Sequence, residues 1–229
     1  MRKAGGYGVA VTLAEEIMLL SLDDVSGVAK ERQTAAWAVA GGILLDLVLA
    51  GRLSVDEGRL KVTDATPTEV PLLDERLRQI GAWCAKKGKA PKVTEWLTKD
   101  QSKAVKATVE SLRERGLVRE ERQRVMGLFP VARYPEADGS VERELRARLQ
   151  TVLTTGPTHS ARTTGLLALI HGARLHRLAF PDLPRKEVAA RLEELTAGQW
   201  AAESVRRAIR DMQAAMLVVT TATVVAVTS

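Results

Sequence analysis

The hydrophobic and polar positions along the chain predict a series of helices, and one of them lacks a polar face. Between Arg32 and Arg52 the only charged residue is Asp46, and most of the segment is Ala, Leu, Val and Gly. An amphipathic helix shows polar positions at a period of 3.6 residues, whereas this segment is apolar all round. We therefore predict a central core helix that other helices enclose, in preference to a membrane span.

Amphipathic helices are predicted on both sides of this segment. The capping box Thr12-Leu-Ala-Glu15 begins a short helix that runs to Leu22. Residues 214–227 are apolar, and we expect them to pack back into the core as helix or strand. Six further segments carry apolar residues at helical spacing: Leu73, Leu77, Ile80 and Cys84; Val105, Val109 and Leu112; Val141, Leu145, Leu149 and Val152; Leu166, Ile170 and Ala173; Val188, Leu192 and Leu195; and Val205, Ile209, Met212 and Met216.

Two short β-hairpins are also predicted. In the first, residues 52–55 and 59–63 flank a turn that contains Gly58. In the second, residues 117–118 and 125–131 flank a charged turn at residues 120–123. The predicted fold is mainly α, with a flexible lead over residues 1–11 and a single globular domain over residues 12–229, in which amphipathic helices surround the apolar central helix.

The composition favours helix packing and gives the surface a positive charge. Aromatic residues make up 3% of the 229 residues, and the formal net charge is +6. Such a surface attracts polyanions, either nucleic acid or an anionic membrane. The N-terminal lead lacks the apolar segment of a secretory signal, and Cys84 is the single cysteine, so we expect a cytoplasmic protein.

The sequence offers little chemistry for catalysis. His171 and His176 are five residues apart, which would place them on different sides of a continuous helix, and no other ligand is spaced to complete a metal site. Cys84 falls on an apolar stripe, and Glu15 and Glu16 fit helix capping. We predict no catalytic residue, no metal and no cofactor.

Basic residues recur at helical spacing in two places. One group is Lys103 with Lys106, and the other is Arg206 with Arg207 and Arg210. Each group is either an ordinary solvated face or, given the overall positive charge, a contact for an anionic partner.

Five segments of the chain occur in a characteristic order. They are TLAEEIMLLSLDD (12–24), GGILLDLVLAGRL (41–53), DATPTEVPLLDE (64–75), RGLV (115–118) and RTTGLLALI (162–170). This ordered set resembles the Golgi phosphoprotein 3 family, including its bacterial members. The resemblance implies a buried apolar helix wrapped by amphipathic helices, with a protruding hairpin. It also implies a peripheral membrane role, since the eukaryotic members are adaptors that recognise phosphatidylinositol 4-phosphate and retain glycosyltransferases in the Golgi.

The headgroup pocket of that family uses a Trp and an Arg near the start of the central helix and two Arg residues three positions apart on a later helix. The matching positions here are 31 or 32, 40, 102 and 105, which hold Glu or Arg, Ala, Ser and Val, so the signature is absent. Lys103 and Lys106 keep the spacing one position further on, and Trp37 lies nearby in sequence. Arg32, Trp37, Lys103 and Lys106 are therefore our candidate headgroup-binding residues.

The second predicted hairpin resembles the protruding element of the family. Met126 and Phe129 lie beside Arg122 and Arg124, and apolar side chains flanked by arginines can insert into a headgroup layer. The alternative is that this hairpin packs on its own domain or on a second copy of the chain.

These observations favour a non-enzymatic protein that binds an anionic phospholipid headgroup or membrane surface, at the inner face of the membrane. The alternative is a winged-helix DNA-binding protein, because a helix, residues 114–118 and a charged turn also occur where a wing follows a recognition helix. Nucleic acid is the less favoured partner, since much of the chain lies outside that motif. A protein partner and a homo-oligomer remain open.

Overall fold

The computed structural model describes residues 11–22, 32–125, 129–135, 137, 139–156, 160–197 and 203–227. The fold is mainly helical, as predicted, and one hydrophobic core runs from the first helix to the last. The elements are α1 (Leu13–Ser21), α2 (Arg32–Leu49), β1 (Leu53–Asp56), β2 (Arg59–Val62), α3 (Pro71–Lys87), α4 (Val93–Glu114), β3 (Glu121–Val125), β4 (Phe129–Arg133), α5 (Ser140–Thr155), α6 (Ala161–Gly172), α7 (His176–Ala179), α8 (Arg185–Ala197) and α9 (Glu203–Val227).

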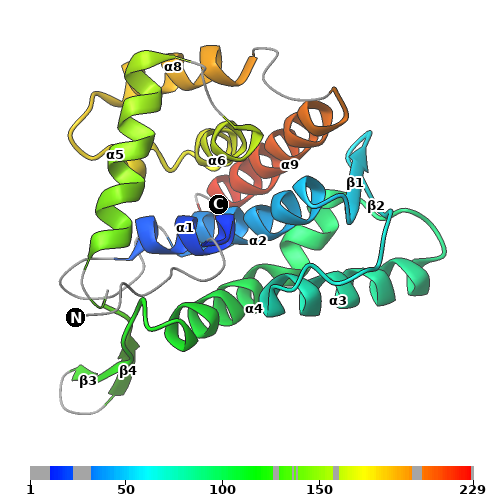
Figure 1. Cartoon of the computed structure of the whole chain (residues 1–229), viewed down its shortest axis with the longest axis horizontal. Helices are drawn as coiled ribbons and strands as arrows, with labels where there is room; N and C mark the ends of the chain where they lie inside the picture. Colours follow the sequence, from blue (N-terminus) through cyan, green and yellow to red (C-terminus); the bar gives the residue numbers. More distant parts are fainter. Residues whose placement is uncertain are drawn as a thin grey trace, which may run out of the picture.

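Helix α2 lies at the centre of the molecule (Figure 1), as its apolar sequence predicts. Every residue from Ala35 to Val48 is buried. Helices α1, α4, α6 and α9 pack around it. Across the described part of the chain, no helix combines the length and the apolar character that a membrane crossing requires.

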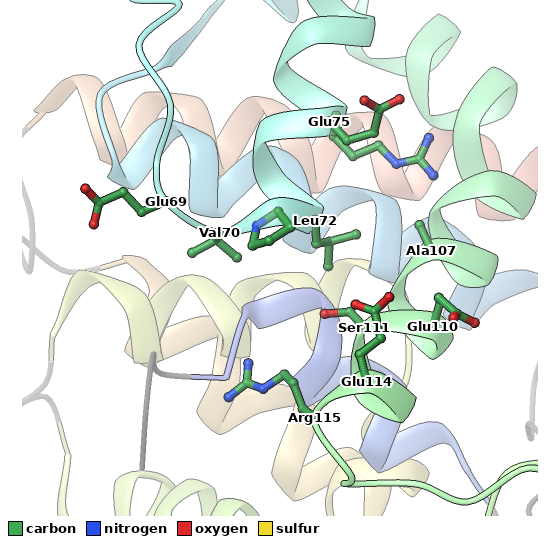
Figure 2. A pocket seen from close by; sticks show the side chains of 11 residues that line it. Glu69, Val70, Leu72, Glu75, Ala107, Glu110, Ser111, Glu114 and Arg115 are labelled. Carbon is green, nitrogen blue, oxygen red and sulfur yellow. The ribbon is translucent and has the colours of Figure 1, made fainter. Parts of the chain in front are cut away.

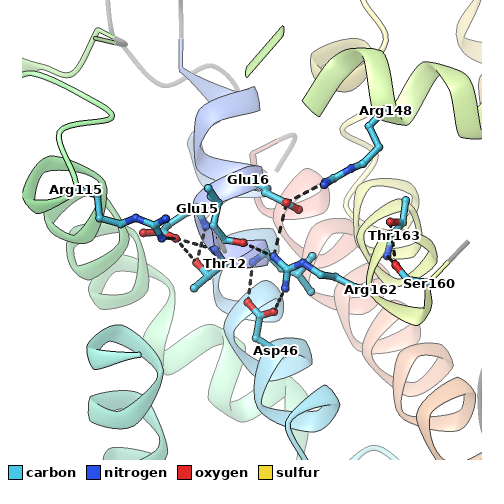
Figure 3. Close-up of polar contacts among 11 residues, drawn as sticks. Thr12, Glu15, Glu16, Asp46, Arg115, Arg148, Ser160, Arg162 and Thr163 are labelled. Carbon is cyan, nitrogen blue, oxygen red and sulfur yellow. Dashed lines mark hydrogen bonds and ion pairs between the residues drawn. The ribbon is translucent and has the colours of Figure 1, made fainter. Parts of the chain in front are cut away.

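Buried ion pairs join α1 to its neighbours (Figure 3). The predicted capping box is present, and its Glu15 carboxylate also pairs with Arg115 at 2.8 Å. Glu16 pairs with Arg148 at 2.9 Å. Asp46 of α2 accepts a hydrogen bond from the Leu13 amide at 2.7 Å and pairs with Arg162 of α6. These carboxylates therefore position α1 between α2, α5, α6 and the end of α4.

The first hairpin, β1–β2, forms as predicted. Glu57 and Gly58 both have positive φ, which is typical of the two-residue turn that joins twisted strands. The second hairpin also forms, but the prediction of a turn at residues 120–123 was wrong. Strand β3 covers these positions except residue 120, and it pairs with β4 as far as Val125 and Phe129. In Figure 1 the hairpin extends away from the helices.

The structure decides between helix and strand for the C-terminal segment, and it differs from the sequence prediction in the chain that follows α6. The apolar C-terminal segment is helical and belongs to α9, which packs against α2 and α6. The short helix α7 was not predicted. The predicted separation of His171 and His176 was wrong, because α6 ends at Gly172 and the chain turns back, bringing His171 Nδ1 within 3.2 Å of His176 Nε2.

Candidate anionic-membrane interface

The structure describes the side chains of three of the four residues predicted to contact a headgroup. Trp37 is 4% exposed, within the core beside α2's other buried residues, and this position does not support direct contact with a headgroup. Arg32 begins α2, and its side chain lies outside the described residues. Lys103 and Lys106 are both exposed on α4.

Helices α3 and α4 form an antiparallel pair that presents lysines on one side. Lys99, Lys103 and Lys106 are exposed and lie within an arc of about 60° on α4, because each residue advances a helix by about 100°. Lys86, near the end of α3, lines the same cavity as Lys99 and Lys103. We call Lys86, Lys99, Lys103 and Lys106 the lysine face.

A cavity of about 310 Å³ lies between the two helices at the lysine face. Trp83 and Trp96 also line it, with ring centroids 5.2 Å apart. Lys87 Nζ lies 5.7 Å from the centroid of the Trp83 ring, within the range of a cation–π interaction. The cavity therefore combines aromatic walls with ammonium groups at its edge.

Asp100, the carboxylate that lines this cavity, is paired with Arg76. Asp100 is 2% exposed, and its Oδ1 lies 2.9 Å from Arg76 Nη1. Burial raises the pKa of Asp100 to about 6, which the charge of Arg76 opposes. Arg76 also donates to the carbonyl oxygen of Lys103 at 2.6 Å, so the same guanidinium ties α3 to α4.

The lysines of this face have no direct ion pair among the described residues, although burial raises the pKa of Asp100 and the charges of Lys103 and Lys99 help to lower it. Within the described part of the chain, none of its four lysines forms an ion pair, whereas Arg78 beside them pairs with Glu75 at 2.6 Å. Lys87 pairs with Glu95 at 2.7 Å. The four ammonium groups are therefore available to an external anion.

A larger cavity, about 540 Å³, lies between the start of α3 and the end of α4 (Figure 2). Its lining includes Glu69, Glu75, Glu110 and Glu114, while its Arg115 is paired with the buried Glu15. Arg76 also lines the cavity but is paired with Asp100, so carboxylates outnumber the available cations there, which disfavours an anion.

The hairpin residues predicted to contact the membrane are placed only in part. Arg122 and Arg124 belong to β3 and Phe129 begins β4, but their side chains lie outside the described residues. Met126 lies outside them altogether. Membrane contact by this hairpin stays a prediction.

The fold and this surface define a class of protein: a helical domain built around an enclosed apolar helix, with a cationic face on one helical pair. The chain belongs to the Golgi phosphoprotein 3 (GPP34) family, whose model matches residues 13–212. A search of curated proteins gave no match. The family assignment agrees with the resemblance seen in the sequence.

The sequence suggested half of this face and missed the other half. The spacing of Lys103 and Lys106 on an amphipathic helix is visible in the sequence. Lys99 continues the same stripe one turn earlier and could have been found by that rule. Lys86 joins it only through the packing of α3 against α4, for which no local signal exists.

Proposed function

We propose that this chain is a non-enzymatic protein that binds anionic membranes through the lysine face of α3 and α4. One observation carries the proposal: four exposed lysines lie on one side of a helical pair, and within the described residues none of them has an ionic partner. Membership of the Golgi phosphoprotein 3 family supports the same conclusion.

The expected strength follows from the number of lysines. Each basic residue near an anionic surface contributes about 1 kcal/mol, so four lysines supply up to about 4 kcal/mol. Such binding is reversible and weakens as salt screens the charges. It needs no insertion of a helix, which suits a chain whose apolar helix is enclosed.

Specificity for phosphatidylinositol 4-phosphate is a separate question. The positions that bind this headgroup in the family hold Ala at 40, Ser at 102 and Val at 105. Ala40 is fully buried. We therefore propose recognition of anionic lipid in general, with a phosphorylated inositol headgroup as the specific lipid to test.

Co-sedimentation with vesicles tests the proposal. Phosphatidylcholine vesicles with increasing fractions of phosphatidylserine are compared for the wild type and for the triple variant K99Q/K103Q/K106Q. Removing three charges is expected to weaken binding by about 100-fold, from about 1 kcal/mol per residue. The control K61Q/R177Q/K186Q removes the same charge from exposed positions elsewhere and is expected to bind like the wild type.

Three results would contradict the proposal: equal binding to neutral vesicles, no loss in the triple variant, or an equal loss in the control. A further set of vesicles with phosphatidylinositol 4-phosphate tests the specific headgroup. Titration with duplex DNA tests the alternative, since tight binding with a sequence preference would favour a DNA-binding protein over a membrane-binding one.

A further inference from the structure

A second cationic cavity lies between α6, α8 and α9, away from the lysine face. Its volume is about 520 Å³, which is within the usual range for small-molecule sites. In Figure 1, α6 and α8 lie on the opposite side of α2 from α3 and α4. We call His171, Arg174, His176, Arg185 and Arg210, which all line this cavity, the histidine–arginine pocket.

The end of α6 builds one wall of this pocket. Leu175 N donates to the Ile170 carbonyl oxygen at 2.9 Å and Arg174 N donates to that of His171 at 3.0 Å, a pattern typical of a helix that ends in a left-handed residue. That residue is Arg174, with φ of +57°. Glycine is favoured at such a position, so Arg174 carries backbone strain of roughly 1 kcal/mol.

The two histidines leave a hydrogen-bonding group without a partner. His171 Nδ1 and His176 Nε2 are 3.2 Å apart, so one nitrogen donates to the other. His176 is 4% exposed, and its Nδ1 has no hydrogen-bond partner among the described residues. When His171 donates, His176 carries its proton on the buried Nδ1, which has no acceptor among the described residues.

Positive charge surrounds these imidazoles. Burial lowers the pKa of His176, and the charges of His171, Arg185 and Arg174 lower it further. Neither arginine forms an ion pair within the residues that the structure describes. Arg210 is paired with Glu203 at 2.8 Å, and Glu193 is the carboxylate that lines the pocket.

We propose that the histidine–arginine pocket binds a small anion that carries a phosphate group. Arginines that follow α6, begin α8 and belong to α9 line the pocket, and guanidinium groups from three elements suit a tetrahedral phosphate with several acceptor oxygens better than a planar carboxylate. The volume leaves room for an organic group beside the phosphate. The phosphate comes either from a soluble compound or from a lipid headgroup, and the two sources share this chemistry.

The position of the pocket favours the soluble source, a point that rests on the proposed membrane function. If the lysine face lies on a membrane, α6 and α8, which line the pocket, lie on the far side of α2 from that bilayer. A soluble phosphate compound can then bind while the protein is on the membrane.

Calorimetric titration of the full chain with inorganic phosphate and with glycerol 3-phosphate tests the proposal. R174G and R185Q are each expected to weaken binding at least about tenfold, since a charge-assisted hydrogen bond contributes about 1.5–3 kcal/mol. R177Q, which changes an exposed neighbour outside the pocket, is expected to bind like the wild type. R174G gives a particularly clear result, because glycine relieves the strain at φ +57° and the variant is expected to melt no lower than the wild type.

Vesicles that contain phosphatidic acid distinguish the two sources. If R174G and R185Q weaken binding to these vesicles as well as to soluble phosphate, the pocket takes a headgroup; if they weaken only the latter, it takes a soluble compound. The proposal is overturned if the wild type binds neither phosphate probe, or if both arginine variants bind like R177Q. The triple variant of the lysine face is expected to keep phosphate binding, so failure of one proposal leaves the other standing.

Discussion

Two adjacent glycines of α2 allow a direct test of how closely α1 packs on the central helix. A Cβ atom at Gly42 would lie 2.8 Å from the backbone nitrogen of Ala14 and 3.0 Å from the carbonyl carbon of Leu13. At Gly41 it would lie 2.8 Å from Met216 Cε and 3.2 Å from Leu169 Cδ2, which are the ends of flexible side chains. G42A therefore pushes against backbone, whereas G41A pushes against atoms that can move.

The magnitude follows from three contributions. Alanine gains about 1 kcal/mol over glycine in the interior of a helix, and this gain is the same for both variants. Overpacking against backbone costs about 3 kcal/mol, at the upper end for cores, because α1 is buried along its whole length and has no free direction. Moving α1 also stretches the bond from the Leu13 amide to Asp46, which contributes about 1 kcal/mol. G42A is thus expected to lower the free energy of unfolding by about 3 kcal/mol.

Chemical denaturation followed by far-ultraviolet circular dichroism measures this difference. G41A is expected to unfold within about 1 kcal/mol of the wild type, because the helix propensity gain offsets the movement of Met216. In a thermal melt the same loss in G42A corresponds to a midpoint lowered by roughly 6–12 °C for a chain of this size. If G42A is as stable as G41A, the close approach of α1 to α2 described here is wrong.

Three further predictions concern buried charge. Burial raises the pKa of Asp100 to about 6, so at pH 5 the folded state binds a proton that the unfolded state lacks. The contribution of Asp100 to the free energy of unfolding therefore rises by about 1 kcal/mol between pH 7 and pH 5, and urea titrations of D100N are expected to lack this gain. His176 has the opposite effect, because its pKa is lowered to about 4 and the unfolded state binds the proton first. Its contribution to the free energy of unfolding falls by about 2 kcal/mol from pH 7 to pH 5, and H176Q is expected to remove this loss. R162M leaves Asp46 without its ionic partner and weakens the pairing of Glu16. Urea titration is expected to show a free energy of unfolding lower by about 3–5 kcal/mol, and a loss below about 1 kcal/mol would contradict a structural role for the pair of Arg162 and Asp46.

Periodicity predicts the helices well because most of them bury one face. The uninterrupted apolar sequence of α2 gives its central position, and the predicted stripes of α5, α8 and α9 are largely buried. The end of α2 was also predictable, since Gly51 adopts φ of +71° as a left-handed cap. Each of these features depends on residues that are close together in the sequence, so it can be predicted without knowing how the helices pack.

The same reasoning fails where an element has no buried face or where contacts are distant. Residues 120–123 resemble a turn because they are polar, yet β3 tolerates polar residues as part of a hairpin that extends from the body. The pairing of Glu15 with Arg115 joins residues 100 positions apart, and no spacing rule reaches that far. The contact between His171 and His176 depends on Arg174 adopting a conformation that glycine usually provides.

The candidate sites show why counting basic residues is not enough. Lysine and arginine contribute equally to the net charge, but the structure uses them differently: most ion pairs of the described residues involve arginine, and Lys87 is the one lysine in an ion pair there. A planar guanidinium suits a fixed carboxylate partner, whereas a hydrated ammonium group stays in solvent. Among the described residues, unpaired positive charge is gathered around a cavity in two places, the lysine face and the histidine–arginine pocket with Arg174 and Arg185. Those two places, rather than the overall charge, are where an anionic ligand should bind.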